Sequence, residues 1–192
     1  MKHLLPAARM LLIFTILTGV IYPVFVTGTV QVFYPAQANG SLITVGETVV
    51  GSALIGQTVN DARYFQGRPS VINSMQADEV ALTASAGSNA GATNPIFIQT
   101  VADRDAAVRT ANNLGADADV PADLVYASGS GLDPHISLQA ANLQAARIAE
   151  ARGMVLTDIE ALIDRFTEPP QFGLFGEIRV NVLLLNLALD HE

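Results

Sequence analysis

The sequence predicts an α+β protein, in which a single N-terminal transmembrane helix is followed by one extracytoplasmic domain of mixed helices and strands. The first observation is that no charged residue occurs from Met10 to Gly46, and the part from Met10 to Phe33 is apolar enough to cross a bilayer. The second is that the rest of the chain alternates helix-like and strand-like patterns, separated by Gly and Pro.

The apolar segment is long enough to span a membrane. Its 24 residues make a helix of roughly 36 Å, against a hydrocarbon core of roughly 30 Å. Lys2 and Arg9 precede it, whereas the first charge after it is Glu47. Because positive charge stays on the cytoplasmic side, we expect a cytoplasmic N-terminus at 1–9, a transmembrane helix at 10–33 and a periplasmic domain at 34–192. These features predict a single-pass protein of the inner membrane.

A cleaved signal peptide is the alternative interpretation. Ala36-Gln37-Ala38 has the small-x-small pattern of a cleavage site. However, the apolar core of a signal peptide runs roughly 7–15 residues, and this segment is longer. Phe33 and Tyr34 also stand where an aromatic belt meets the outer interface. The sequence therefore favours a retained anchor.

Composition limits the classes of function. About 155 residues follow the span, enough for one domain with its own core. Without Lys2 and Arg9, eight of the ten basic residues remain against 18 acidic ones, a net charge of −10. This acidity argues against binding nucleic acid or anionic lipid head groups. The chain has no cysteine, which excludes disulfides, a thiolate nucleophile and cysteine-ligated metal.

The first half of the chain carries few regular patterns. Pro6 suits a helix start, Tyr22-Pro23 predicts a kink in the span, and Asn39-Gly40 predicts a turn after it. Residues 48–55 read as a strand of small and β-branched residues. Residues 70–94 are rich in Ser, Asn, Ala and Gly and read as a long loop.

Capping residues mark the later elements. Asn94 is expected to cap a helix from Pro95 to Gly115, and Ser137 a second helix that ends before Gly153. A third is expected from Thr157, with Glu160 completing a capping box. Its buried face is predicted at positions 159, 162, 163 and 166, and that of the first helix at 97, 101, 108 and 111. Residues 124–127 read as a short strand, and for the tail, 180–189, helix is favoured over strand.

The motifs of common enzyme classes are missing. The only lysine is Lys2, so a P-loop is excluded, and the three histidines show no metal-ligand spacing. Ser128, Ser130, Asp133 and His135 lie within eight residues without a nucleophile-elbow pattern, unlike a triad that converges from separate segments. We therefore expect neither catalytic nor metal-binding residues.

Three polar segments remain as candidate sites. Residues 129–137 are interpreted as a structured connection between a strand and a helix, with an anion or partner site at the helix start as the alternative. Residues 86–95 resemble a phosphate-binding loop in composition but lack its lysine. Residues 63–70 combine two arginines with two aromatics, which fits an anchor for another protein and core packing equally well.

Several segments, taken in order, resemble the C subunit of the bacterial Kdp potassium-transporting ATPase. They are LTGVIYP (17–23), QANGSL (37–42), GSALIGQ (51–57), RYFQGRPS (63–70), GSN (87–89) with TNP (93–95), ASGSGLDPHIS (127–137), RVNVL (179–183) and LNLALD (185–190). The resemblance covers nearly the full length. Departures include Leu138 and Ile178 in place of proline, and Glu168-Pro169-Pro170 in place of Glu-Gly-Arg.

The resemblance implies a non-catalytic accessory subunit of a high-affinity, ATP-driven potassium uptake pump. Its partners would be a channel-like potassium-binding subunit, a P-type ATPase subunit and a small single-span subunit. The family is described as a catalytic chaperone that raises the pump's ATP affinity through a transient ternary complex with ATP; no prosthetic group is implied. A periplasmic domain cannot reach cytoplasmic ATP, so we expect coupling through the transmembrane partners. The alternative is a free-standing periplasmic binding module, tethered or released after cleavage.

Two sets of residues follow as candidates. In the span, Thr15, Thr18 and Gly19 share a face and predict close packing against a partner helix. The candidate packing set also includes Tyr22 and Pro23, at the expected kink. In the domain, the candidates for a partner or nucleotide-linked site are Gln57, Arg63, Arg68, Ser88, Asn89, Asn94, Ser130, Asp133, His135 and Arg179.

Overall fold

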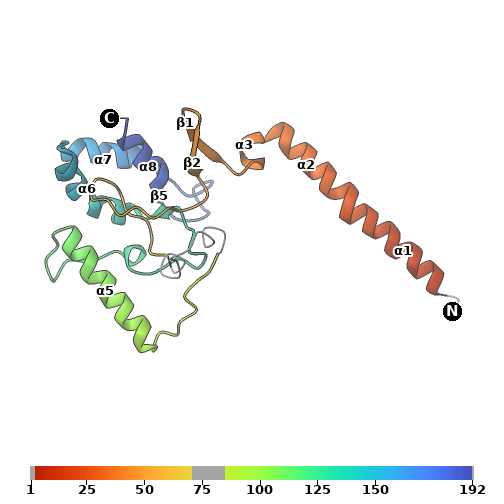
Figure 1. The fold of residues 1–192 in the computed structure, drawn as a ribbon, viewed down its shortest axis with the longest axis horizontal. Coiled ribbons are helices and arrows are strands. Elements are labelled where there is room, and N and C mark those ends of the chain that lie inside the picture. The colour runs from red at the N-terminus through yellow and green to blue at the C-terminus, as the bar shows by residue number, and fades with distance from the viewer. Residues whose placement is uncertain (1–2, 71–84, 192) are drawn as a thin grey trace. The chain divides into compact units, whose positions relative to one another are not determined.

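The computed structural model describes residues 3–70 and 85–191, so most of the loop predicted at 70–94 lies outside the described residues. The chain divides into two compact units, Met1–Val50 and Gly51–Glu192. Figure 1 shows the first unit as a long helix followed by a small hairpin, and the second as helices around a small sheet. The predicted α+β class is confirmed.

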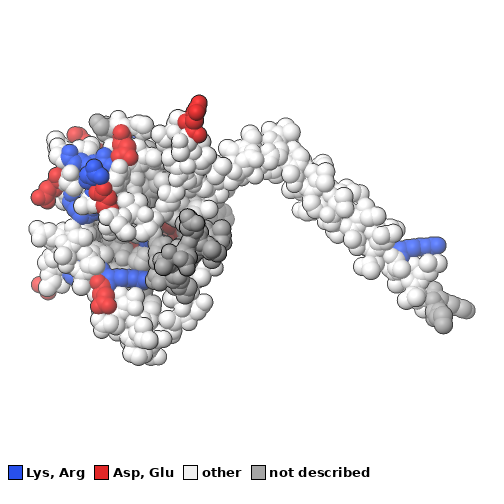
Figure 2. Space-filling view, in the orientation of Figure 1, with Lys and Arg blue, Asp and Glu red and all other residues white. Residues whose placement is uncertain are grey.

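The long helix of the first unit runs from Leu4 to Phe33 and is apolar enough to cross a membrane. It consists of α1 (Leu4–Ile16), a π-helical turn η1 (Leu17–Ile21) and α2 (Tyr22–Phe33). Figure 2 shows one basic side chain near its start and uncharged atoms along the rest. A one-turn helix, α3 (Pro35–Ala38), and a two-stranded sheet of β1 (Leu42–Val45) and β2 (Thr48–Ser52) follow.

The irregularity predicted at Tyr22-Pro23 takes the form of the π-helical turn. The backbone N–H of Tyr22 donates to the carbonyl of Leu17, five residues back. Pro23 has no N–H, and in a regular helix its ring would press on the carbonyl of Gly19. One extra residue in the preceding turn relieves that conflict, as π-bulges do elsewhere.

Helices in the second unit begin and end at the capping residues that the sequence indicated. Asn94 accepts hydrogen bonds from two N–H groups at the start of α5 (Pro95–Ala111), and Ser137 accepts one from Ala140 at the start of α6 (Leu138–Arg152). Gly153 ends α6 in the left-handed conformation, with φ +67°. Helix α8 (Val182–Leu189) confirms the helix favoured for the tail, and the side chain of Asn181 caps it.

Several predicted boundaries and elements are wrong. The 48–55 strand ends at Ser52, whose hydroxyl accepts from Leu54 N–H in a turn. Residues 124–127 form no strand; a 3₁₀ turn, η3 (Ala122–Leu124), lies there instead. Helix α5 ends at Ala111, before Gly115, and its predicted apolar face contains no fully buried residue. Helix α7 (Leu156–Arg165) begins after Val155 without a side-chain cap, so Thr157 and Glu160 form no capping box.

The sheet of this unit was not predicted. Three antiparallel strands of two or three residues, β3 (His135–Ile136), β5 (Arg179–Asn181) and β4 (Thr167–Glu168), pair in that order. Helix α6 packs against both α7 and β5, and α8 against α7. The alanines of α6 at positions 140, 141, 145 and 149 are buried, so its backbone approaches the core closely. The core also contains Phe65, Ile136, Ile148, Ile159, Ile163 and Leu185, whereas Phe166, predicted buried, is half-buried.

Candidate functional site

A segment that begins with a turn at Asp61–Tyr64, residues 61–70, is held on the second unit by two buried carboxamides. Phe65 is fully buried. Its N–H donates to Asn186 Oδ1 at 2.8 Å, and its carbonyl accepts from Asn186 Nδ2 at 2.9 Å. Gln144 makes the same pair of bonds to Gln66: the Gln66 N–H donates to Gln144 Oε1 at 2.8 Å, and Gln144 Nε2 donates to the Gln66 carbonyl at 3.1 Å. The two side chains replace the neighbouring strand that this backbone would otherwise need.

Two arginines on α6 fix the start of the same segment. Arg147 donates to the carbonyls of Ala62 and Tyr64, and burial lowers the pKa of its guanidinium. Arg152 donates to the carboxylate of Asp190 at 2.8 Å, which also accepts from the hydroxyl of Tyr64 at 2.9 Å. Partial burial raises the pKa of Asp190, but these two hydrogen bonds together with the nearby charges of Arg152 and His191 outweigh it and leave the pKa lowered.

The loop before β3 is ordered by its own hydrogen bonds and follows the 3₁₀ turn η3, not the strand expected at 124–127. Ser128 Oγ accepts from Gly131 N–H, and Ser130 Oγ accepts from Leu132 N–H. Ahead of α6, the N–H and hydroxyl of Ser137 both donate to the carboxylate of Asp123, at 2.6 and 3.2 Å. The carboxylate of Asp123 therefore occupies this helix start, where the alternative interpretation placed an external anion.

Asp133 joins this loop to the 61–70 segment. Its carboxylate accepts from the His135 N–H and from Arg68 Nη1, each at 3.0 Å, and lies 3.5 Å from His135 Nδ1. The His135 side chain, then its backbone N–H and Arg68, lower the pKa of Asp133 to about 2 against the effect of burial. Arg68 Nε is buried and has no hydrogen-bond partner among the described residues.

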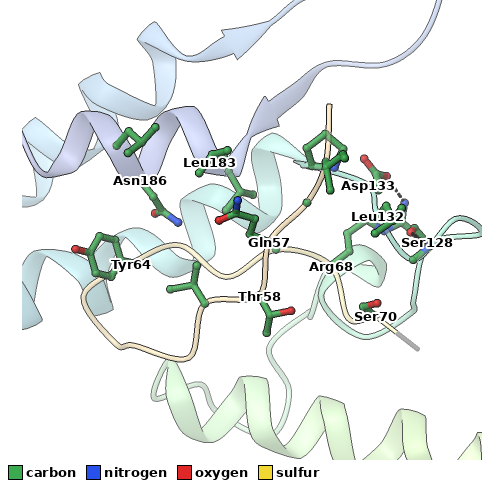
Figure 3. Close-up of a pocket in the computed structure, with 18 of the residues that line it drawn as sticks. Gln57, Thr58, Tyr64, Arg68, Ser70, Ser128, Leu132, Asp133, Leu183 and Asn186 are labelled. Atoms are coloured by element: carbon green, nitrogen blue, oxygen red, sulfur yellow. Dashed lines mark hydrogen bonds and ion pairs between the residues drawn. The ribbon is translucent and has the colours of Figure 1, made fainter. Parts of the chain in front are cut away.

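A cavity of about 590 Å³ lies between the 55–70 segment, the loop 128–134 and α8. Figure 3 shows Leu183 and Asn186 on its α8 side, Leu132 and Asp133 on the loop side, and Gln57 between them. The walls are mainly apolar, and Arg68 and Asp133 supply a paired charge at the loop side. The arrangement fits a ligand or peptide side chain with a large apolar part.

A second recess, of about 370 Å³, opens beside the same ion pair. Arg68, Asp133, His135 and Arg179 line it. Arg179 stands directly opposite Glu168 across β5 and β4 and forms an ion pair with it at 3.0 Å. A cross-strand pair of this kind stabilises the sheet.

The structure brings together half of the predicted domain residues. Gln57, Arg68, Asp133, His135 and Arg179 surround the two cavities. The other five, which lie elsewhere or act as structural groups, are Arg63, Ser88, Asn89, Asn94 and Ser130.

These five have identifiable local roles or surroundings. Arg63 is exposed and pairs with Asp61 at 2.7 Å. Asn94 caps α5. The carbonyl of Ser130 accepts from Ala86 N–H at 3.0 Å, so the loop that resembled a phosphate-binding loop packs on the loop 128–131. Ser88 and Asn89 are exposed in that loop.

Sequence reasoning missed Gln144 and Asn186. Both are polar residues at buried positions of otherwise apolar helix faces. A buried carboxamide requires hydrogen-bond partners. A lone Gln or Asn on an apolar helix face was therefore the one feature of the sequence that could have indicated these residues. The partners lie 78 and 121 residues away and could not be read from spacing.

The predicted packing face of the membrane helix is open in the described chain. Thr15, Thr18 and Gly19 are exposed, and a Cβ added at Gly19 would meet nothing within 4 Å. The hydroxyl of Thr18 donates to the carbonyl of Phe14 at 2.7 Å, which satisfies it inside the helix. This face leaves room for the close approach of a partner helix, and packing against one stays a prediction.

The described residues form one helix that is long and apolar enough to cross a membrane, and one α+β domain in which Asn186, Gln144 and Arg147 bind the chain's own backbone. A family model described as "KdpC: K+-transporting ATPase, c chain" matches residues 4–191. The chain therefore belongs to the KdpC family.

Individual relatives agree with this assignment. A potassium-transporting ATPase KdpC subunit of Methylococcus capsulatus is 53% identical over 189 residues, which cover 98% of this chain and 97% of the relative. The corresponding protein of Mycobacterium bovis is 49% identical, with 98% of each chain covered. That of Geotalea uraniireducens is 48% identical over 191 residues, which cover 99% of this chain and 98% of the relative.

Proposed function

We propose that this chain is a non-catalytic accessory subunit of an ATP-driven potassium uptake pump and is needed for assembly of the pump. The observation that carries the proposal is the family match over residues 4–191, which includes both the membrane helix and the domain. In the domain, Asn186, Gln144 and Arg147 hold the chain's own backbone, so their role is structural.

Assembly is the direct test. Pump subunits carrying an affinity tag on the ATP-hydrolysing subunit are purified from cells with and without this chain. We expect the channel-like subunit and the small single-span subunit to co-purify in lower amount when the chain is missing. An unchanged subunit ratio would contradict the proposal.

We further propose that the domain lies in the periplasm and the helix remains as an inner-membrane anchor. Support comes from the helix Leu4–Phe33, which carries no charge from Met10 onward, and from the placement of Lys2 and Arg9 before this apolar segment. Protease added to intact spheroplasts should digest the domain, and complete protection would refute this orientation. The intact mass of the mature chain tests the released form, since cleavage after Ala38 would remove 38 residues.

In this arrangement the chain raises the ATP affinity of the pump without contacting nucleotide. The periplasmic domain would act on a cytoplasmic site by favouring one conformation of the membrane subunits, which is a coupling free energy between distant sites. Photoaffinity labelling with an ATP analogue tests the absence of contact. The label should appear on the ATP-hydrolysing subunit, and specific labelling of this chain would show a direct nucleotide site.

A further inference from the structure

The loop between β4 and β5 exposes an unusual run of large apolar side chains. Phe172 is 96% exposed, Leu174 76%, Phe175 63% and Ile178 50%. Isolated exposed apolar residues are ordinary on protein surfaces, but clusters mark interaction sites. In the described part of Gly51–Glu192, no other stretch of seven residues exposes four large apolar side chains.

A tight turn presents Phe172 at the tip of this loop. The carbonyl of Gln171 accepts from the N–H groups of Leu174 and Phe175, at 3.1 and 2.9 Å, and Phe175 O accepts from Gln171 N–H at 2.8 Å. Phe172 has φ +56° and Gly173 has φ +71°. Positive φ at both central residues defines a type I′ turn, which favours Asn, Asp or Gly at the first of them. A bulky aromatic there is an outlier.

The outlier is informative because Asn would fit this backbone better than Phe. Strained residues persist where the side chain has a function that offsets the conformational cost. An aromatic ring on a preformed turn also loses little conformational freedom on binding, which is the usual character of an interface anchor.

We propose that residues 171–178 form a knob that inserts into an apolar pocket on the extracytoplasmic surface of another pump subunit. The identity of the partner as a pump subunit rests on the proposed function. The knob is a contact additional to the membrane helix, and Phe172 is its central anchor.

Charge favours a protein pocket over the bilayer surface as the partner. No lysine or arginine occurs from Phe166 to Ile178, and Glu177 lies at the base of the knob. Arg179, which follows it, is paired with Glu168. Loops and helices that bind membrane surfaces combine apolar residues with basic ones that attract anionic lipids. The net charge of −10 after Arg9 would oppose such attraction.

The first experiment compares Phe172→Asn with Val155→Asn in the complete pump. Val155 is also an exposed apolar residue, and it holds the N-cap position of α7 with φ −76° and ψ +136° but no side-chain cap. Asn suits the local backbone at both positions, so both variants should melt at or above the wild-type temperature. We expect Phe172→Asn to leave the purified pump about tenfold faster than the wild-type chain. Val155→Asn should match the wild type, and equal rates for the two variants would overturn the proposal.

The second experiment identifies the partner directly. Phe172→p-benzoylphenylalanine, irradiated in the assembled pump in native membranes, should form an adduct with another pump subunit. The same replacement at Val155 is the control. An adduct with lipid alone, or no adduct, would overturn the proposal.

The two proposals fail in different ways. If the wild-type chain does not co-purify with the pump, the proposed function fails. If it co-purifies but the Phe172 variants behave like the Val155 variants, the knob alone is refuted.

Discussion

Replacing Asn186 by leucine tests the strongest structural inference about the domain. The change keeps a side chain of similar volume on α8 but removes both hydrogen bonds to Phe65, of 2.8 and 2.9 Å. Phe65 is fully buried and Asn186 nearly so. The Phe65 N–H and carbonyl would lose these partners at a buried position.

The magnitude follows from the cost of unsatisfied buried groups. Each costs about 1–3 kcal/mol, so the two together cost about 4 kcal/mol. Burying leucine in place of the carboxamide returns about 1–2 kcal/mol. The net loss is about 2–3 kcal/mol, which lowers the melting temperature of a domain of this size by about 10 °C.

Circular dichroism of the full chain in detergent provides the assay, because the chain has no tryptophan. The matched control is Asn142→Leu, a change of the same chemistry at an exposed position of α6, which should shift stability by no more than about 0.5 kcal/mol. If Asn186→Leu melts within error of Asn142→Leu, the inference that these carboxamide bonds hold the 61–70 segment is refuted.

The other predictions concern the loop before β3, the 55–70 segment and the span. The pKa of Asp133 is lowered from 3.8 to about 2 in the folded chain, so its contribution to stability is present above pH 3.8 and is lost as the pH falls towards 2. In Asp133→Asn, the free energy of unfolding should therefore depend less on pH in that window. An unchanged pH dependence would contradict this. Gly56→Ala should destabilise the domain by at least about 1 kcal/mol in chemical denaturation, because the added Cβ would overlap the carbonyl oxygen of Asp133. The control is Gly91→Ala, where an added Cβ would meet nothing within 4 Å. Gly19→Leu should weaken co-purification of the pump while leaving membrane insertion intact, because leucine inserts readily but blocks close helix approach; full retention of the complex would show that this face does not pack against a partner.

Local signals in the sequence predicted local structure well. Asn94, Ser137 and Gly153 mark helix ends because each satisfies backbone groups within its own turn. The same reasoning failed at Thr157, where the helix begins one residue earlier and Val155 holds the cap position. It also failed at residues 124–127, whose β-like composition did not outweigh the 3₁₀ turn that follows Pro121.

Long-range features of the domain could not be predicted from patterns. Strands β3, β4 and β5 are two or three residues long, too short for an alternating pattern. The Arg68–Asp133 ion pair joins residues 65 positions apart. The sequence indicated both segments as candidates but contained no signal that they meet.

For residues 171–178, by contrast, the sequence itself contains an indication of the unusual turn. Phe172-Gly173 stands between Gln171 and Leu174, where Asn-Gly would be the ordinary turn pair. The apolar residues around it, at 174, 175 and 178, lack the spacing of a buried helix or strand.

The central claim is that this chain acts on the pump's ATP affinity from outside the catalytic subunit. The most direct measurement is the ATP dependence of potassium-stimulated hydrolysis by the pump, purified with and without this chain. The proposal predicts a higher KM for ATP when the chain is missing, and its restoration when the purified chain is added back. An unchanged KM and an unchanged potassium-stimulated rate in the complex that lacks the chain would contradict it.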